Sequence, residues 1–528
     1  MGIKHSFAFL IALVLGGAAA ASPALAQTQT AQARDTKPLS AIDWLSRSVV
    51  TPAAVHPGAS THPPVSGAGG IENISVLSLD APSADRLGLL SEARTGLPAN
   101  LWGSTPAPEL ARALRNTPDD NLPALHDLLM TLLLAELDPP QITTPAQRDM
   151  LFLARVDRLL DMGALQQAHA LLEQADPTNP AIFRRRFDVA LLLGNETEAC
   201  RVMERTPAIA PSYPARIFCL ARTGHWDTAE LTYGTGRALG QIPEDQAELI
   251  AQFLDPELAD GADDLTPPDP VTPLSFKMME AIGQPLATSM LPLAFAHADL
   301  TENNGWKAQL EAAERLARAG VIDPNRLLGL YTERKAAASG ALWDRVSAIT
   351  ALDKAMNAQD NAAVAKALPR AWREMSKQEL EPMLGTLYGT RLAAMNLPGD
   401  AGRIAHDLGL LTPDYEEIAN DGSGTGANAA LLSGFAKGQS AGIPAQDDLT
   451  RALKDVFDTA PGAVPARYAG LLPDQLGAAL LHAIDDVAQG ARGDYPRLVD
   501  GLKLLRLAGL ESTARRAAIE LIVLDRRG

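Results

Sequence analysis

Two cysteines, Cys200 and Cys219, are the residues of this sequence best suited to forming a covalent link, and they are its only cysteines. We expect them on two neighbouring helices, where they form either a disulfide or a pair of buried free thiols. A disulfide requires Cα atoms within roughly 7 Å of each other. A catalytic thiol would need a CxxC pair or a supporting histidine arrangement, and the sequence has neither. We therefore favour the disulfide.

Histidines are scattered and do not have the spacing of metal ligands. The sequence has 9 of them and no HExxH motif. His297 with Asp299, and His482 with Asp485 and Asp486, are local pairings that a solvated helix surface also produces. We expect no metal and no cofactor.

Two short motifs resemble catalytic signatures only superficially. The glycine-rich stretch 422–426 lacks the following lysine of a phosphate-binding loop, so we expect a plain loop. Glu511 and Ser512 resemble the Glu-Ser pair of periplasmic lytic transglycosylases, but no Gly-Leu-Met-Gln-like segment follows. A general acid also needs a cleft and a raised pKa. We interpret Glu511 as a first-turn helix residue and expect that the protein is not an enzyme.

The composition favours a helical protein with an acidic surface. Alanine and leucine dominate, whereas aromatic residues make up only 5% of the 528 residues. Such a composition suits helix packing better than strands. The formal net charge of -17 argues against nucleic acid as a partner, because phosphate binding depends on clustered lysine and arginine.

Export is predicted by the N-terminal residues. Lys4 is followed by an apolar stretch at 7–15 and by a small-x-small cleavage site that ends at Ala26. We therefore expect residues 1–26 to be a signal peptide and the mature protein to be periplasmic or, alternatively, secreted. Other apolar runs are far shorter than the roughly 20 residues that cross a bilayer, so no membrane span is expected after cleavage.

A tether with one short helix is expected after the signal. Residues 27–70 are rich in Pro, Thr, Ala, Ser and Gly and predict disorder. Within them, 39–49 has capping-box spacing and an apolar face. So short a helix is marginal alone in water, so we expect it to dock either on a partner or on the protein's own body. Its candidate partner-binding residues are Leu39, Ile42, Trp44 and Leu45.

A repeat is clearest between 150 and 240. The segments 163–168, 194–199 and 224–229 share Gly-x4-Ala at intervals of 31 and 30 residues. Glycine permits the left-handed turn that closes one helix, and alanine lets the next helix approach closely. Segment 509–514 repeats the pattern, and 358–363 is a degenerate version without the glycine.

These hairpins resemble the tetratricopeptide repeat family, which has Gly at the turn, Ala early in the second helix and Pro at the end of the unit, here Pro180 and Pro211. The family's large aromatic positions are mostly Leu, Arg or Val here, and the period is shorter. The resemblance implies an all-α fold, an α-solenoid of antiparallel helical hairpins, and protein binding on a concave surface.

The predicted organisation after the tether has four parts. An extended lead-in at 71–105 precedes helical repeats at 106–254, a second helical block at 274–412 and a C-terminal helical block at 427–528. Acidic and glycine-rich loops separate the blocks. Within the repeats we expect the aromatic residues Tyr213, Phe218 and Trp226 to lie in the core.

Together these patterns predict a non-catalytic periplasmic scaffold or adaptor that binds envelope proteins through a helical surface and the tethered helix. Two alternatives stay open: an accessory regulator of a cell-wall enzyme, and a glycan- or small-ligand-binding solenoid. The low aromatic content argues against the last.

Overall fold

The structure, a computed structural model, describes residues 83–259, 263–336, 338–422, 424–459 and 462–525. The four residues predicted to bind a partner through the tether lie outside these ranges. The described chain is built from α-helices and short 3-10 turns, and its only β contacts are two isolated bridges. The all-α prediction is confirmed.

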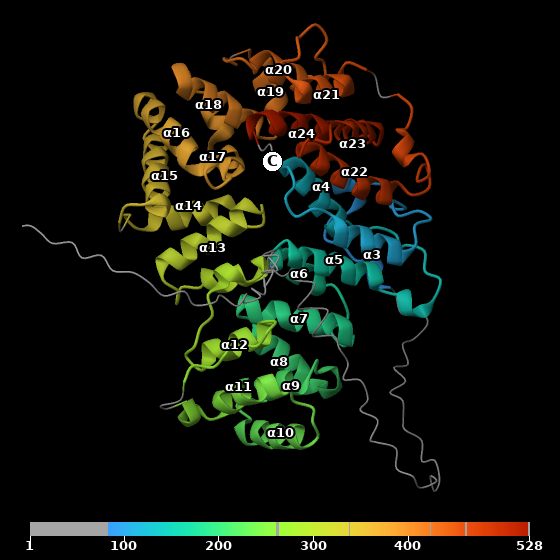
Figure 1. The fold of residues 1–528 in the computed structure, drawn as a ribbon, viewed down its shortest axis with the longest axis vertical. Coiled ribbons are helices and arrows are strands. Elements are labelled where there is room, and N and C mark those ends of the chain that lie inside the picture. The colour runs from blue at the N-terminus through green and yellow to red at the C-terminus, as the bar shows by residue number, and fades with distance from the viewer. Residues whose placement is uncertain (1–82, 260–262, 337, 423, 460–461, 526–528) are drawn as a thin grey trace, which may run out of the picture. The chain divides into compact units, whose positions relative to one another are not determined.

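Helices follow one another as antiparallel hairpins along the chain (Figure 1). The first group comprises η1 (Ala84–Arg86), α2 (Glu92–Thr95), α3 (Ala107–Asn116), α4 (Pro123–Leu134), α5 (Met150–Asp161) and α6 (Leu165–Leu172). The second comprises α7 (Pro180–Leu193), α8 (Glu196–Arg205), α9 (Tyr213–Arg222), α10 (Trp226–Ala238), α11 (Glu244–Leu254) and α12 (Pro273–Ala281).

The third group comprises η6 (Leu293–Leu300), α13 (Trp306–Arg318), α14 (Pro324–Glu333), α15 (Ala341–Asn357), α16 (Asn361–Ser376), α17 (Glu381–Ala393) and α18 (Gly399–Leu410). The fourth comprises α19 (Tyr415–Asn420), α20 (Ala429–Ala436), α21 (Asp448–Phe457), α22 (Leu476–Ala491), α23 (Tyr495–Leu507) and α24 (Glu511–Val523). Short 3-10 turns η2 (Pro145–Gln147), η3 (Pro207–Ile209), η4 (Pro256–Ala259), η5 (Thr288–Met290) and η7 (Ala466–Tyr468) connect some of them.

The repeat glycines adopt the left-handed conformation that the Gly-x4-Ala pattern predicts. Their φ angles are 75° at Gly163, 75° at Gly194, 88° at Gly224 and 81° at Gly509. In each case the following helix begins two residues later. The alanines of the pattern are all buried, at Ala168, Ala199, Ala229 and Ala514. The pattern therefore marks a real structural unit, a turn followed by a closely packed helix.

The degenerate copy of the motif is shifted by one residue from its predicted place. The left-handed residue is Gln359, with a φ of 53°, and α16 begins two residues later. The buried position equivalent to the repeat alanine is therefore Val364, whereas Ala363 is only partly buried. Glu379, with a φ of 55°, makes the same turn before α17. Backbone hydrogen bonds close both turns around these non-glycine residues: the Asp360 N–H donates to the Ala355 carbonyl at 3.2 Å, and the Leu380 N–H donates to the Met375 carbonyl at 3.1 Å.

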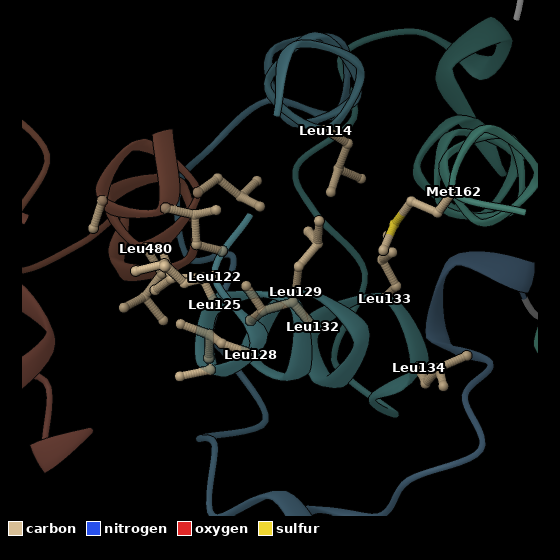
Figure 2. Packing of buried hydrophobic residues seen from close by; sticks show 14 of the residues in the cluster. Leu114, Leu122, Leu125, Leu128, Leu129, Leu132, Leu133, Leu134, Met162 and Leu480 are labelled. Atoms are coloured by element: carbon tan, nitrogen blue, oxygen red, sulfur yellow. The ribbon is translucent and has the colours of Figure 1, made fainter. Parts of the chain in front are cut away.

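Buried apolar residues form three clusters. One lies within α7 to α12, and another is formed by α13 to α18. The largest combines the first group of helices with η6 and with α19 to α24, so it takes residues from all three predicted helical blocks. Figure 2 shows its centre, where the leucines of α4 lie between Leu480 of α22 and Met162, which follows α5.

The first and last groups of helices are joined directly. The Gly477 N–H donates to the Leu101 carbonyl at 2.9 Å, and the Ser104 N–H donates to the Asp474 carbonyl at 3.0 Å. A Cβ atom at Gly477 would lie 2.4 Å from the buried Trp102 ring, so only glycine fits there. Helix α24 also packs on α4 (Figure 1). The first and last groups of helices are therefore in direct contact, through backbone hydrogen bonds and through helix packing.

Within the described ranges, no helix has both the length and the apolar character needed to cross a bilayer.

Candidate protein-binding surface

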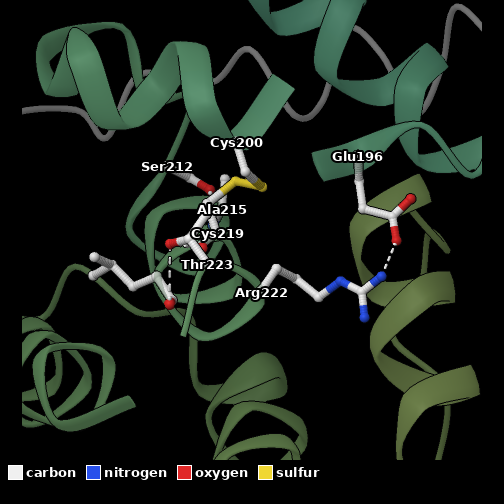
Figure 3. Close-up of a disulfide and its surroundings, with 8 residues drawn as sticks. Glu196, Cys200, Ser212, Ala215, Cys219, Arg222 and Thr223 are labelled. Atoms are coloured by element: carbon white, nitrogen blue, oxygen red, sulfur yellow. Dashed lines mark hydrogen bonds and ion pairs between the residues drawn. A yellow bond between two sulfur atoms is a disulfide. The ribbon is translucent and has the colours of Figure 1, made fainter. Parts of the chain in front are cut away.

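Cys200 of α8 and Cys219 of α9 form the disulfide that the sequence suggested, with Cα atoms 5.0 Å apart (Figure 3). Both side chains are buried, and the described part of the chain has no free cysteine. The alternative of two free thiols is therefore not what the structure shows. The bond fixes the second helix of one hairpin to the first helix of the next.

Polar contacts reinforce the same helix pair. The Ser212 hydroxyl accepts the Ala215 N–H at 3.2 Å and so caps α9. The Arg222 guanidinium donates to the buried Glu196 carboxylate at 2.5 Å, which ties the end of α9 to the start of α8 (Figure 3). Together with the disulfide, these contacts hold α8 and α9 against each other. The following helix, α10, packs on α9.

Helix α10 exposes large apolar side chains. Trp226 is 46% exposed and Leu231 is 70% exposed, and Leu239, directly after the helix, is 61% exposed. The prediction that Trp226 is a core residue is wrong, whereas Phe218 is buried and Tyr213 is partly buried against the same apolar cluster. The reason is that α10 packs mainly on α9 and α11, and Ala229 and Gly236 are its only buried residues.

The threonines on this helix add little polarity to its surface. The Thr232 hydroxyl donates to the Thr228 carbonyl at 2.7 Å, and the Thr235 hydroxyl donates to the Leu231 carbonyl at 2.8 Å. These donors are therefore already used by the backbone of α10 itself. Besides Asp227, the side of α10 that carries Leu231 presents glycine, threonine and alanine to the surface.

Gly234 stands in the middle of α10 without a packing reason inside the molecule. A Cβ atom there would meet nothing within 4 Å, whereas one at Gly236 would lie 3.0 Å from the Tyr213 ring. Glycine inside a helix costs about 1 kcal/mol relative to alanine. The close contact with Tyr213 explains why residue 236 is glycine. No contact within the chain offsets the lower helix stability that Gly234 causes.

Charged residues lie beside this face and, in the case of Asp227, on it. Asp227, Glu230 and Arg237 are all exposed, and no salt bridge reaches any of them within the described ranges. The Arg237 guanidinium carbon lies 5.9 Å from the centre of the Tyr233 ring. The acids belong to the N-terminal half of α10 and the base to its C-terminal half.

A cavity of about 650 Å³ lies elsewhere, between α17, α18 and the glycine-rich loop. Arg403 extends from its wall and is held by Asp400 at 2.7 Å and by Asp407 at 2.8 Å. A Cβ atom at Gly424 would lie 2.9 Å from the His406 ring, so the loop packs closely on that ring. Because two carboxylates neutralise the only arginine of the lining, the cavity does not favour an anion.

The His-acid pairs do not come together as sites. Nε2 of the buried His297 lies 2.7 Å from the Gly163 carbonyl, and burial lowers the pKa of His297. Asp299 instead accepts a hydrogen bond from Thr288. His482 is exposed, while the two aspartates near it bind Arg497 at 2.6 Å and 2.5 Å. Among the described residues, no three His, Cys, Asp or Glu side chains converge as metal ligands would.

Glu511 has the electrostatics of a structural carboxylate. Burial raises its pKa, but hydrogen bonds from Arg506 at 2.8 Å and Arg515 at 3.0 Å outweigh that effect and leave the pKa below its ordinary value. A general acid requires the opposite shift. Glu511 begins α24, as the sequence predicts for a first-turn residue.

Sequence reasoning missed the exposed residues of α10. Leu231 and Gly234 carried a signal, since a leucine off the apolar stripe and a glycine inside a helical segment are both unfavourable for an isolated fold. No protein-family model, no curated protein and no solved structure matches the chain.

Proposed function

We propose that this protein is a non-catalytic scaffold or adaptor of the periplasm, which binds envelope proteins through its helical-repeat surface and through the helix predicted at 39–49. The exposed apolar face of α10 is the observation that carries the proposal. Single exposed apolar residues are normal on a protein surface, whereas several of them on one short element favour an interaction site. Trp226, Leu231 and Leu239 place three large apolar residues on one short stretch.

The disulfide supports the location in this proposal. Disulfides persist in oxidising compartments such as the periplasm and are rare in the cytosol. Cys200 and Cys219 are bonded in the helix pair directly preceding α10. In an exported scaffold, that bond would hold α9 in place, and α9 is the helix on which the binding helix α10 packs.

A second candidate function is small-ligand or glycan binding at the cavity beside His406. Its volume of about 650 Å³ lies within the range of small-molecule sites. The lining contains Asn396, Asp400 and Thr425, which could bind hydroxyl groups. A third, regulation of a cell-wall enzyme, predicts that hydrolase activity co-purifies with the protein.

Site-specific photo-crosslinking in the periplasm tests the scaffold proposal. The crosslinker is placed at Leu231 and, as a matched control, at Ile142, which is 49% exposed outside α10. Adducts at Leu231 and none at Ile142 are the expected result. Repeating the experiment without residues 27–70 separates partners of α10 from partners of the predicted tether. Equal labelling at the two positions would contradict a binding role for α10.

A further inference from the structure

The exposed face of α10 has the properties of a self-complementary surface. Leu231, Gly234, Thr235 and Ala238 are spaced three or four residues apart, so they share one side of the helix. All four are exposed, and so is Asp227, which lies on the same side of the helix four residues before Leu231. Glu230 and Arg237 are also exposed and lie together along one edge of that side, next to Gly234.

Gly234 determines how closely another helix can approach. The absence of a side chain lets a facing backbone come near, and the space beside it is open. A neighbouring helix packed there would place its own side chains over Gly234 and between Leu231 and Ala238. The occupant that fits best is therefore a helix with a comparably small, weakly polar face.

The charged residues beside this face indicate which helix could pack on it. In a pair of antiparallel helices related by a two-fold axis, the same edge of each helix faces the other copy. Glu230 and Arg237 are equally distant from the midpoint between Tyr233 and Gly234. Each Glu230 would then lie opposite Arg237 of the second copy, giving two equivalent ion pairs from charges that the described structure leaves unpaired.

We propose that α10 pairs in antiparallel fashion with α10 of a second copy of this chain, around Gly234, with reciprocal Glu230 to Arg237 contacts. The inference rests on the proposed role of α10 as a binding surface and names its partner. One short helix from each copy makes a small interface, so the dimer forms reversibly and depends on concentration.

Sedimentation velocity of the mature chain over a concentration series measures this association. Gly234→Gln fills open space and improves the helix, so the monomer stays folded while close approach is blocked. We expect it to raise the dimer dissociation constant at least about tenfold. Gly329→Gln is the matched control, because Gly329 also lies within a helix, α14, with nothing within 4 Å of a Cβ atom. It should leave the dissociation constant unchanged.

Charge reversal tests the antiparallel register. Glu230→Arg alone and Arg237→Glu alone should each weaken self-association, because each places like charges opposite one another. Mixing the two single variants should restore a dimer that contains one copy of each. The double variant should also dimerise with itself. No parallel or unrelated contact predicts this pattern.

A chain that stays monomeric at every concentration, or a dimer indifferent to Gly234→Gln and to both charge reversals, overturns the inference. Crosslinking at Leu231 to a different protein by a monomeric chain would leave the scaffold proposal standing and reject self-association alone. Loss of the crosslink together with an absence of dimer would reject both.

Discussion

The Glu520 carboxylate accepts the backbone N–H of Ala124 with both oxygens, at 3.1 Å and 2.9 Å, across 396 residues of sequence. Ala124 lies in the first turn of α4, where unpaired N–H groups and the helix dipole favour a negative charge. Glu520 is only 2% exposed. A single carboxylate of α24 therefore caps a helix of the first group.

Replacing Glu520 by alanine should lower the free energy of unfolding by about 1 to 3 kcal/mol, because the Ala124 N–H is left buried without its acceptor. Urea denaturation followed by circular dichroism gives the value. Glu302→Ala, at an exposed position, is the control and should change stability little. A loss of equal size in both variants would show that Glu520 does not cap α4.

Breaking the disulfide should also destabilise the fold. The bonded cysteines are separated by 19 residues, and a loop of about that length contributes about 3 kcal/mol through the unfolded state. The Cys200→Ser and Cys219→Ser double variant should lose about that amount in urea denaturation. Reductant should lower the Tm of the natural protein and leave that of the double variant unchanged. Equal sensitivity of the two proteins to reductant would count against this account.

Asp188 should make stability depend on pH. Burial raises its pKa to about 7, and the opposing charges of Arg184 and Arg185 do not overcome this effect. An unfolded aspartate loses its proton near pH 4. Between about pH 4 and pH 7 the folded chain thus holds a proton that the unfolded chain has released, so the free energy of unfolding falls as pH rises.

Asp188→Asn removes that ionisation. The unfolding free energy of the variant minus that of the natural protein should increase from pH 4 to pH 7, by up to about 4 kcal/mol, and then level off. Urea denaturation at several pH values measures the difference. A difference that stays constant with pH would show that Asp188 ionises normally in the fold.

Gly477→Ala should disturb the contact between the first and last groups of helices. The new methyl group would meet the Trp102 ring, and overpacking of this kind costs typically about 1 to 3 kcal/mol. Thermal denaturation should show a lower Tm. Gly329→Ala, in the open on α14, should instead raise the Tm slightly, because alanine favours helix. The expected result is that the Tm falls for Gly477→Ala and rises for Gly329→Ala, although both substitutions replace glycine by alanine.

Sequence patterns predicted the local features of this fold well. The left-handed turns at Gly163, Gly194 and Gly224 follow from a requirement of the backbone, which is visible wherever glycine recurs at a fixed spacing. The Cys200 to Cys219 bond follows from placing two residues on neighbouring helices of that repeat. Where glycine is absent, as at Gln359, the register of the turn shifted by one residue.

Local sequence patterns could not predict which helices have few neighbours in the fold, or which residues are exposed as a result. Trp226 has the size and apolarity of a core residue, but α10 packs mainly on α9 and α11, and this packing leaves Trp226 exposed. Likewise, no local pattern predicts the hydrogen bond between Gly477 and Leu101, because the two residues are far apart in the sequence and belong to no common repeat. The candidate surface on α10 was therefore visible only after the fold was known.

The capping of α4 by α24 also sets an order of events during synthesis. Ala124 is made 396 residues before Glu520, which corresponds to roughly 20 to 80 s at the usual rate of translation. Until then the leucines of α4 lack their contact with α24, and the ring of Trp102 lacks its contact with α22 until Gly477 is made. A chain cut short before α22 would keep this apolar surface open, so chaperones and proteases could distinguish an unfinished copy from a complete one.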